Sequence, residues 1–272
     1  MNEQLSRRCA LVIFAAMGLA LLAGMLAWGP IGVDARHHRY ADGRAWLGVP
    51  NASNVLASLL LSIAGAWGWL ATRASRWPTE MRQAWMSFHV CAAAAGLLTG
   101  VYHLAPTDLS YLLAHVVASG AFTLLAAGVL AERVHARFGS ARALTAVVLV
   151  VLAAASLVGV NAARNHGVDL RPLALLEALP LLLIPSGVLS LPGIQTRHSD
   201  WMLLLLAYAA AKLFDLADAK VFSLTGWVGG HALMHLTLAV MTARLAYCAA
   251  AASTGDACDA PTQRQTSLNT AG

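Results

Sequence analysis

Charged residues are scarce in this chain. Only 11% of its 272 residues are Asp, Glu, Lys or Arg, whereas a typical soluble domain carries about a quarter. Hydrophobic residues make up 58% of the sequence, and the net charge of +5 comes mostly from arginines between the apolar stretches. This balance excludes an ordinary soluble domain and gives no reason to expect nucleic-acid binding. It favours a protein embedded in a membrane.

Cysteine is also scarce. The four cysteines form no Cys-x-x-Cys pair, and they are Cys9, Cys91, Cys248 and Cys258. Their spacing gives no support for a disulfide framework or a thiolate metal site. Cys9, Cys91 and Cys248 lie in or beside apolar stretches, where a cysteine usually serves as a small buried hydrophobe.

Long apolar runs, by contrast, recur along the whole chain. They approach the ~20 residues that a helix needs to span the hydrocarbon core of a bilayer. We expect about eight such helices, over 10–29, 54–72, 84–103, 109–131, 143–162, 172–191, 200–222 and 227–249. The fold class is therefore all-α, a polytopic membrane helix bundle with a seven-helix core and one N-terminal helix. We expect residues 1–29 to form the cytoplasmic N-terminus and a retained first helix, 30–251 the membrane domain, and 252–272 a disordered cytoplasmic tail.

The loop arginines predict the orientation in the membrane. Nine lie on the side of the N-terminus, at positions 7, 8, 73, 76, 82, 133, 137, 142 and 197, and five on the other, at 36, 39, 44, 164 and 171. Cytoplasmic loops are enriched in Lys and Arg, so both termini are expected in the cytoplasm. We expect a multi-pass protein of a bacterial-type inner membrane.

Three histidines at the ends of apolar stretches suggest a metal site. His231 and His235 are spaced i, i+4 and so share one face of a helix, and His103 ends another apolar stretch. Polar side chains at membrane depth are costly and usually have a partner or a task. In the predicted orientation all three lie at the outer, periplasmic side. Three imidazoles with an open fourth position suit catalytic Zn²⁺, which lowers the pKa of a bound water to about 7.

Two further polar groups accompany the histidines. Thr99 lies one turn before His103, so its hydroxyl could hydrogen-bond the attacking water or the oxyanion of a tetrahedral intermediate. Lys212, Asp215 and Asp218 follow one another at three-residue spacing within the apolar stretch 200–222. For this charged group we expect an internal ion pair at least as readily as a catalytic role.

These motifs resemble a known family. They are 99–106 (TGVYHLAP), 211–218 (AKLFDLAD), 231–235 (HALMH), and the early stretches 40–44 (YADGR) and 47–51 (LGVPN). Over about residues 40–245 the chain resembles the CREST superfamily of seven-helix membrane hydrolases, and among them bacterial alkaline ceramidase-like members. The resemblance implies that His103, His231 and His235 bind zinc. It also implies a ceramidase-like hydrolysis of an amide bond in a lipid or N-acyl substrate, reached from the outer leaflet.

The chain departs from the family pattern at two positions. The family serine is Thr99 here, which keeps the hydroxyl, and the aspartate expected about eleven residues after the first histidine is Ala114. His115 is offset from that position by about 100° around the helix. Asp108, in the short loop nearby, is the candidate for the missing catalytic carboxylate, beside Thr99 as the second catalytic residue, and Asp218 is another candidate.

Other functions fit parts of the same pattern. A zinc-binding membrane receptor or structural protein would keep the metal site and lack catalysis because of Ala114. A haem protein would use two histidines on facing helices, such as His103 and His231. A transporter, the least favoured, would use the charges at Lys212, Asp215 and Asp218 and the proline-containing stretch 172–191, but no inverted repeat supports it.

Overall fold

The computed structural model describes residues 3–165, 167–193 and 195–254. The described chain is helical and contains no strand. Its helices are α1 (Glu3–Trp28), α2 (Ala52–Ala74), α3 (Thr79–Leu104), α4 (Asp108–Arg133), α5 (Ala141–Asn165), α6 (Arg171–Ser190), α7 (His198–Leu216), α8 (Asp218–Thr225) and α9 (Gly230–Thr254), with short 3₁₀ turns η1 (Ala35–His38) and η2 (Ala136–Gly139). Residues 255–272 of the predicted tail lie outside the described residues, and residues 252–254 belong to α9.

Seven helices in the described part are long and apolar enough to cross a membrane. They are α1 to α6 and α9. This confirms the expected all-α, multi-pass membrane bundle. The stretch expected as one spanning helix over 200–222 is not among these seven helices, and the structure divides it into α7 and α8 at Ala217. The division follows from Asp218, whose carboxylate accepts hydrogen bonds from the N–H groups of Ala41 and His231 and so holds the chain close to the start of α9.

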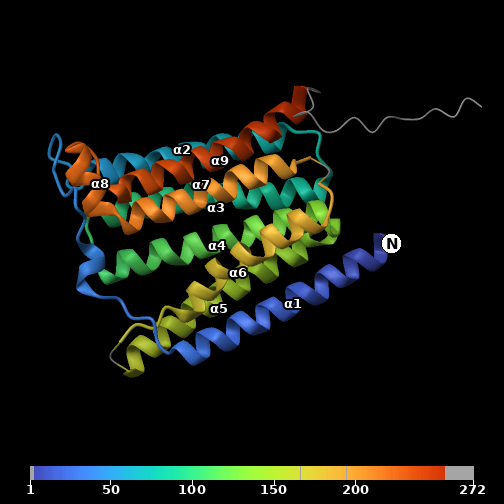
Figure 1. Cartoon of the computed structure of the whole chain (residues 1–272), viewed down its shortest axis with the longest axis horizontal. Helices are drawn as coiled ribbons and strands as arrows, with labels where there is room; N and C mark the ends of the chain where they lie inside the picture. Colours follow the sequence, from blue (N-terminus) through green and yellow to red (C-terminus); the bar gives the residue numbers. More distant parts are fainter. Residues whose placement is uncertain (1–2, 166, 194, 255–272) are drawn as a thin grey trace, which may run out of the picture.

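The helices form a layered bundle in which α2 packs between α9 and α3, and α4 packs between α3 and α6 (Figure 1). Helix α7 lies against α9, and α1 lies at the edge of the bundle along α6. The N-terminal helix therefore packs on the outside of the bundle.

Close contact between α2 and α3 sets the position of the site. A Cβ atom on Gly65 would lie 2.5 Å from the backbone nitrogen of Ala93, and one on Gly96 would lie 2.5 Å from that of Ser62. Small residues at such crossings let membrane helices approach closely. The Ser62 hydroxyl also donates to the Ala93 carbonyl at 2.6 Å. This contact fixes the register of α3 and hence the place of its last turn.

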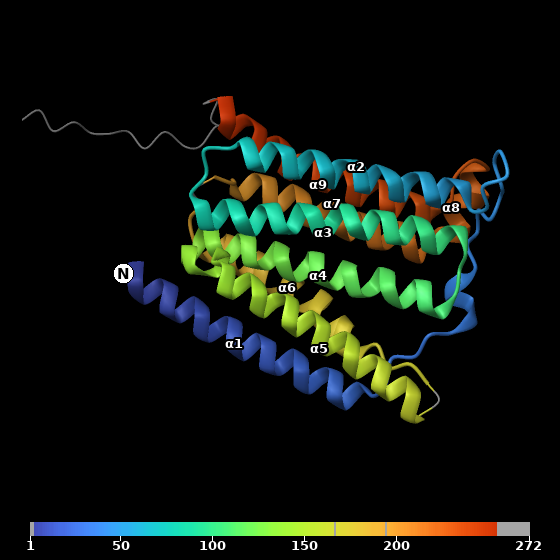
Figure 2. The same cartoon turned by 180° about the vertical axis from the view of Figure 1, so that it is seen from behind.

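The two ends of the bundle differ. Both described ends of the chain, at Glu3 and Thr254, lie at one end (Figures 1 and 2). The loop of residues 29–51, here called the site loop, lies at the opposite end together with α8, the last turn of α3 and the first turn of α9.

Candidate metal centre

The three predicted histidines meet at one point. Nε2 of His103 lies 3.2 Å from Nε2 of His235, which in turn lies 3.1 Å from Nε2 of His231. One ligand atom from each ring lies within 4.8 Å of the others. The side chain of His103 is fully buried and that of His235 nearly so. The predicted convergence is confirmed, whereas the binding of zinc stays a prediction.

Two glycines bring the α9 histidines to this position. A Cβ on Gly230 would lie within 2.0 Å of the Phe214 carbonyl oxygen, and one on Gly229 would lie 2.5 Å from an oxygen of Asp218. Helix α9 therefore begins directly against the end of α7 and the start of α8. This close start places His231, the second residue of α9, beside the carboxylates of those helices.

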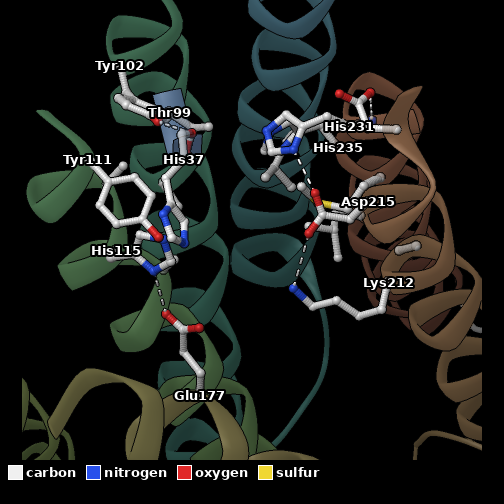
Figure 3. Close-up of a pocket in the computed structure, with 18 of the residues that line it drawn as sticks. His37, Thr99, Tyr102, Tyr111, His115, Glu177, Lys212, Asp215, His231 and His235 are labelled. Atoms are coloured by element: carbon white, nitrogen blue, oxygen red, sulfur yellow. Dashed lines mark hydrogen bonds and ion pairs between the residues drawn. The ribbon is translucent and has the colours of Figure 1, made fainter. Parts of the chain in front are cut away.

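Asp215 holds His231 in place. Its Oδ1 atom accepts a hydrogen bond from Nδ1 of His231 at 2.7 Å, and its Oδ2 atom lies 3.8 Å from the Lys212 ammonium (Figure 3). The expected ion pair of Lys212 and Asp215 is thus confirmed. The hydrogen bond between Asp215 and His231 was not predicted. The sequence feature that could have indicated it is that both residues were expected near the outer end of their helices. A carboxylate on the second nitrogen of a histidine is the usual support of a metal ligand.

The nitrogen geometry fits zinc. Ligands at about 2.0–2.1 Å from a tetrahedral Zn²⁺ lie about 3.3 Å from one another, close to the two distances between Nε2 atoms here. Because Asp215 only accepts, neutral His231 donates from Nδ1 and carries a lone pair on Nε2. Nε2 of His235 lies at hydrogen-bond distance from two other nitrogens, but its one proton can point at only one of them. Hydrogen bonds therefore do not account for both short contacts. A cation bound between the rings would accept a lone pair from each of the three Nε2 atoms.

The site loop covers the histidines. The Tyr40 ring lies over His231 and against His103, with ring centroids 4.6 and 4.8 Å apart. Burial raises the pKa of the Tyr40 phenol above its ordinary value of 10.0, so the hydroxyl stays neutral. The sequence placed Tyr40 in a family motif but gave no sign of this contact, since a loop carries no helical register.

Two carboxylates, those of Asp42 and Asp218, fix the position of the site loop through hydrogen bonds. Asp218 accepts the Ala41 N–H at 2.8 Å. Asp42, which is buried, bonds the Arg44 guanidinium at 2.7 Å, and Arg44 in turn donates to the carbonyls of Gly226 and Trp227 just before α9. The loop is therefore joined to both α8 and the segment that leads into α9.

A cavity of about 510 Å³ adjoins the histidines. In Figure 3, His231, His235 and Asp215 lie on one side of it, and Tyr111, His115 and Glu177 on the other. Apolar side chains complete its lining, among them Leu61, Phe122, Met234 and Leu238. The cavity is therefore lined by both polar and apolar side chains, as small-molecule sites usually are.

The two predicted catalytic residues lie in different surroundings. Thr99 lines the cavity, as does Ala114 at the position of the missing aspartate. Asp108 does not line it. Its side chain is 71% exposed, and its Oδ1 lies 2.9 Å from Nε2 of His38 in the site loop. The structure thus places Thr99 on the wall of the cavity and leaves Asp108 outside it.

Sequence reasoning missed Glu177. Its Oε1 atom lies 3.2 Å from Nδ1 of His115 and 2.9 Å from the hydroxyl of Ser119. The sequence feature that could have indicated it is a single acidic residue within the apolar stretch 172–191, because a charge at membrane depth is costly unless it is paired. The sequence alone does not say which of the neighbouring helices supplies that partner.

Comparisons with protein-family models, curated proteins and solved structures find no match to this chain. Its function is therefore inferred from the motif residues and from the geometry of the site.

Proposed function

We propose that the protein is a zinc-dependent membrane hydrolase, similar to the CREST superfamily, that cleaves an amide bond in a lipid-like N-acyl substrate. The observation that carries the proposal is the spacing of the three Nε2 atoms of His103, His231 and His235. Two of the three nitrogen–nitrogen distances, 3.2 and 3.1 Å, are close to those between tetrahedral zinc ligands, and the site adjoins a cavity within a membrane bundle.

Bound zinc would supply a water of lowered pKa and polarise the substrate carbonyl. The residues of the chain do the rest. His103, His231 and His235 hold the ion, and Asp215 keeps His231 in the tautomer whose Nε2 can bind it. The Thr99 hydroxyl, one turn from His103, donates a hydrogen bond to the substrate carbonyl oxygen as negative charge develops there. The apolar lining of the cavity receives the acyl chain.

The geometry favours zinc over haem. Two axial histidines bind haem iron from opposite faces of a flat macrocycle. Here the Nε2 atoms of His103 and His235 lie 3.2 Å apart, with that of His231 beside them, and this leaves no room for a macrocycle between them. A haem-bound protein would require the helices to separate.

Zinc binding without hydrolysis is the second candidate. Ala114 favours it, because the position where the family carries an aspartate lines the cavity without a carboxylate. Such a protein would sense or store an amphipathic ligand beside a structural metal. The two candidates share the metal and differ in turnover.

Elemental analysis of the detergent-purified protein tests the proposal first. We expect about one zinc per chain, as for a three-histidine site, and loss of it in His231→Ala and in the double variant His231→Ala/His235→Ala. His198→Gln, at an exposed position outside the cavity, is the matched control and should keep the metal. A folded parent without zinc would contradict the proposal.

Turnover is measured next, on a fluorescent N-acyl amino-alcohol lipid in mixed micelles. Release of the fatty acid that depends on zinc supports the hydrolase. A zinc-loaded parent that releases no fatty acid identifies the binding protein instead.

A further inference from the structure

The wall of the cavity that faces the metal-binding histidines carries a second polar group. His115, on α4, and Glu177, on α6, meet there with Nδ1 of the imidazole 3.2 Å from Oε1 of the carboxylate. Both side chains are partly exposed, at 34% and 26%, and both line the cavity. They lie within membrane-spanning helices, where an ionisable pair is costly and marks a functional site by default.

Neighbouring groups hold this pair in one arrangement. The Ser119 hydroxyl, fully buried one turn along α4, lies 2.9 Å from the same Glu177 oxygen. The Tyr111 ring packs on His115 with a centroid distance of 4.3 Å. Because a carboxylate only accepts, Nδ1 of neutral His115 carries the proton. The second nitrogen, Nε2, makes no hydrogen bond to a described residue and keeps its lone pair.

The three carboxylates that the sequence offered near the histidines already have partners. Asp215 bonds His231 and lies beside Lys212. Both oxygens of Asp218 accept backbone N–H groups. Asp108 bonds His38 outside the cavity. A lone pair that is held in place and directed by a carboxylate remains at His115, and this is the arrangement of a general base.

We propose that His115 is the proton-transfer residue of the hydrolysis and that Glu177 positions it, in place of the aspartate that Ala114 lacks. The inference rests on the proposed function. A substrate amide in the cavity would have its carbonyl oxygen toward the metal-binding histidines, with the attacking water and the amide nitrogen both on the side that faces Nε2 of His115.

The proton balance of the reaction needs one such group. The oxygen of a water molecule forms a bond to the carbonyl carbon, and Nε2 of His115 takes a proton from that water. The C–N bond then breaks, and the same Nε2 returns the proton to the departing nitrogen. The products are a fatty acid and an amine, and the imidazole ends neutral as it began. Glu177 stabilises the imidazolium that exists between the two transfers.

His115→Gln is the variant that tests His115. The glutamine amide can still donate to Glu177, so the pair stays satisfied in the membrane and the fold is kept. We expect kcat on the fluorescent N-acyl lipid to fall about 10²–10⁴-fold, the usual contribution of a general acid–base group, with KM and zinc content unchanged. His198→Gln serves again as the control with parental kcat.

Glu177→Gln tests the positioning role. It should lower kcat by a smaller factor than His115→Gln, and the double variant should be no slower than His115→Gln alone, since Glu177 acts through His115. Losses that multiply in the double variant would overturn the positioning role.

The tautomer gives a readout that does not depend on activity. In protein labelled with ¹⁵N-histidine, the signal lost in His115→Gln should show a protonated Nδ1 and an unprotonated Nε2, and Glu177→Gln should disturb it. A proton on Nε2 would overturn the inference. So would an active parent whose His115→Gln variant keeps full kcat, and that result would leave the proposed function intact. A zinc-loaded parent without turnover would overturn both.

Discussion

Asp215 and His231 lie sixteen residues apart in the chain, yet Oδ1 of one is 2.7 Å from Nδ1 of the other. The contact joins the end of α7 to the start of α9. It directs the second nitrogen of His231, with its lone pair, at His235. Three histidines in contact are also found as packing residues, and the carboxylate is what makes this cluster resemble a ligand set.

Removing this support should weaken metal binding without removing it. Asp215→Asn keeps the size of the side chain and loses its charge, so we expect zinc affinity to fall about 10–100-fold, as for other carboxylates that support a metal-binding histidine. Competition with a chromogenic chelator measures it. Lys212→Gln is the matched control, because the Lys212 side chain is half exposed and its ion pair is long, at 3.8 Å. Equal affinity in Asp215→Asn and the parent would contradict the assigned role.

Tyr40 should act as a cover over the metal. Its ring lies on His231 and His103, so Tyr40→Ala is expected to open a path for water and to speed the loss of zinc to a chelator by about tenfold, the effect of about 1.4 kcal/mol of lost packing. Tyr40→Phe keeps the ring and should release zinc at the parental rate. If both variants lose zinc equally fast, the hydroxyl and not the ring would be the important part.

The site loop should loosen in acid. Burial raises the pKa of Asp42, but hydrogen bonds from Arg44 and Ser53 outweigh it, and the net pKa is lower than the ordinary 3.8. A lowered pKa in the folded state means that the Asp42–Arg44 pair stabilises the loop above pH 3.8 and that this contribution is lost as pH falls through the lowered value.

Hydrogen exchange of the loop amides measures this effect. The parent should be better protected than Arg44→Gln near neutral pH, and the difference should disappear once Asp42 is protonated. A difference that persists at the lowest pH at which the protein stays folded would show that Arg44 holds the loop through its bonds to Gly226 and Trp227 instead.

The sequence predicted those parts of the site that follow from helix geometry. The i, i+4 spacing put His231 and His235 on one face, and the direction of each span put His103 at the same depth. Both steps need only local periodicity and the alternation of spans. They also predicted the Lys212–Asp215 pair, which lies within a single helix.

The sequence could not predict contacts between elements whose rotation is set by packing. Glu177 reaches His115 because α6 packs against α4, and the apolar residues of the two helices do not reveal which faces meet. Asp108, near the histidines in sequence, turns to His38 because the site loop passes beside the start of α4. The break between α7 and α8 likewise depends on what Asp218 binds far along the chain.

Membrane topology is the last prediction. The bundle end that holds both described chain ends also holds the arginine-rich turns between α2 and α3 and between α4 and α5. The positive-inside rule therefore predicts that this end is cytoplasmic and that the metal centre is periplasmic.

Cysteine labelling measures this orientation. Leu47 is fully exposed in the site loop, and Arg76 is exposed at the other end. In a background without the native cysteines, Leu47→Cys should react with a membrane-impermeant maleimide in cells with a permeabilised outer membrane, whereas Arg76→Cys should react only after lysis. The reverse pattern would place the metal centre in the cytoplasm and would mean that substrate reaches it from the inner leaflet.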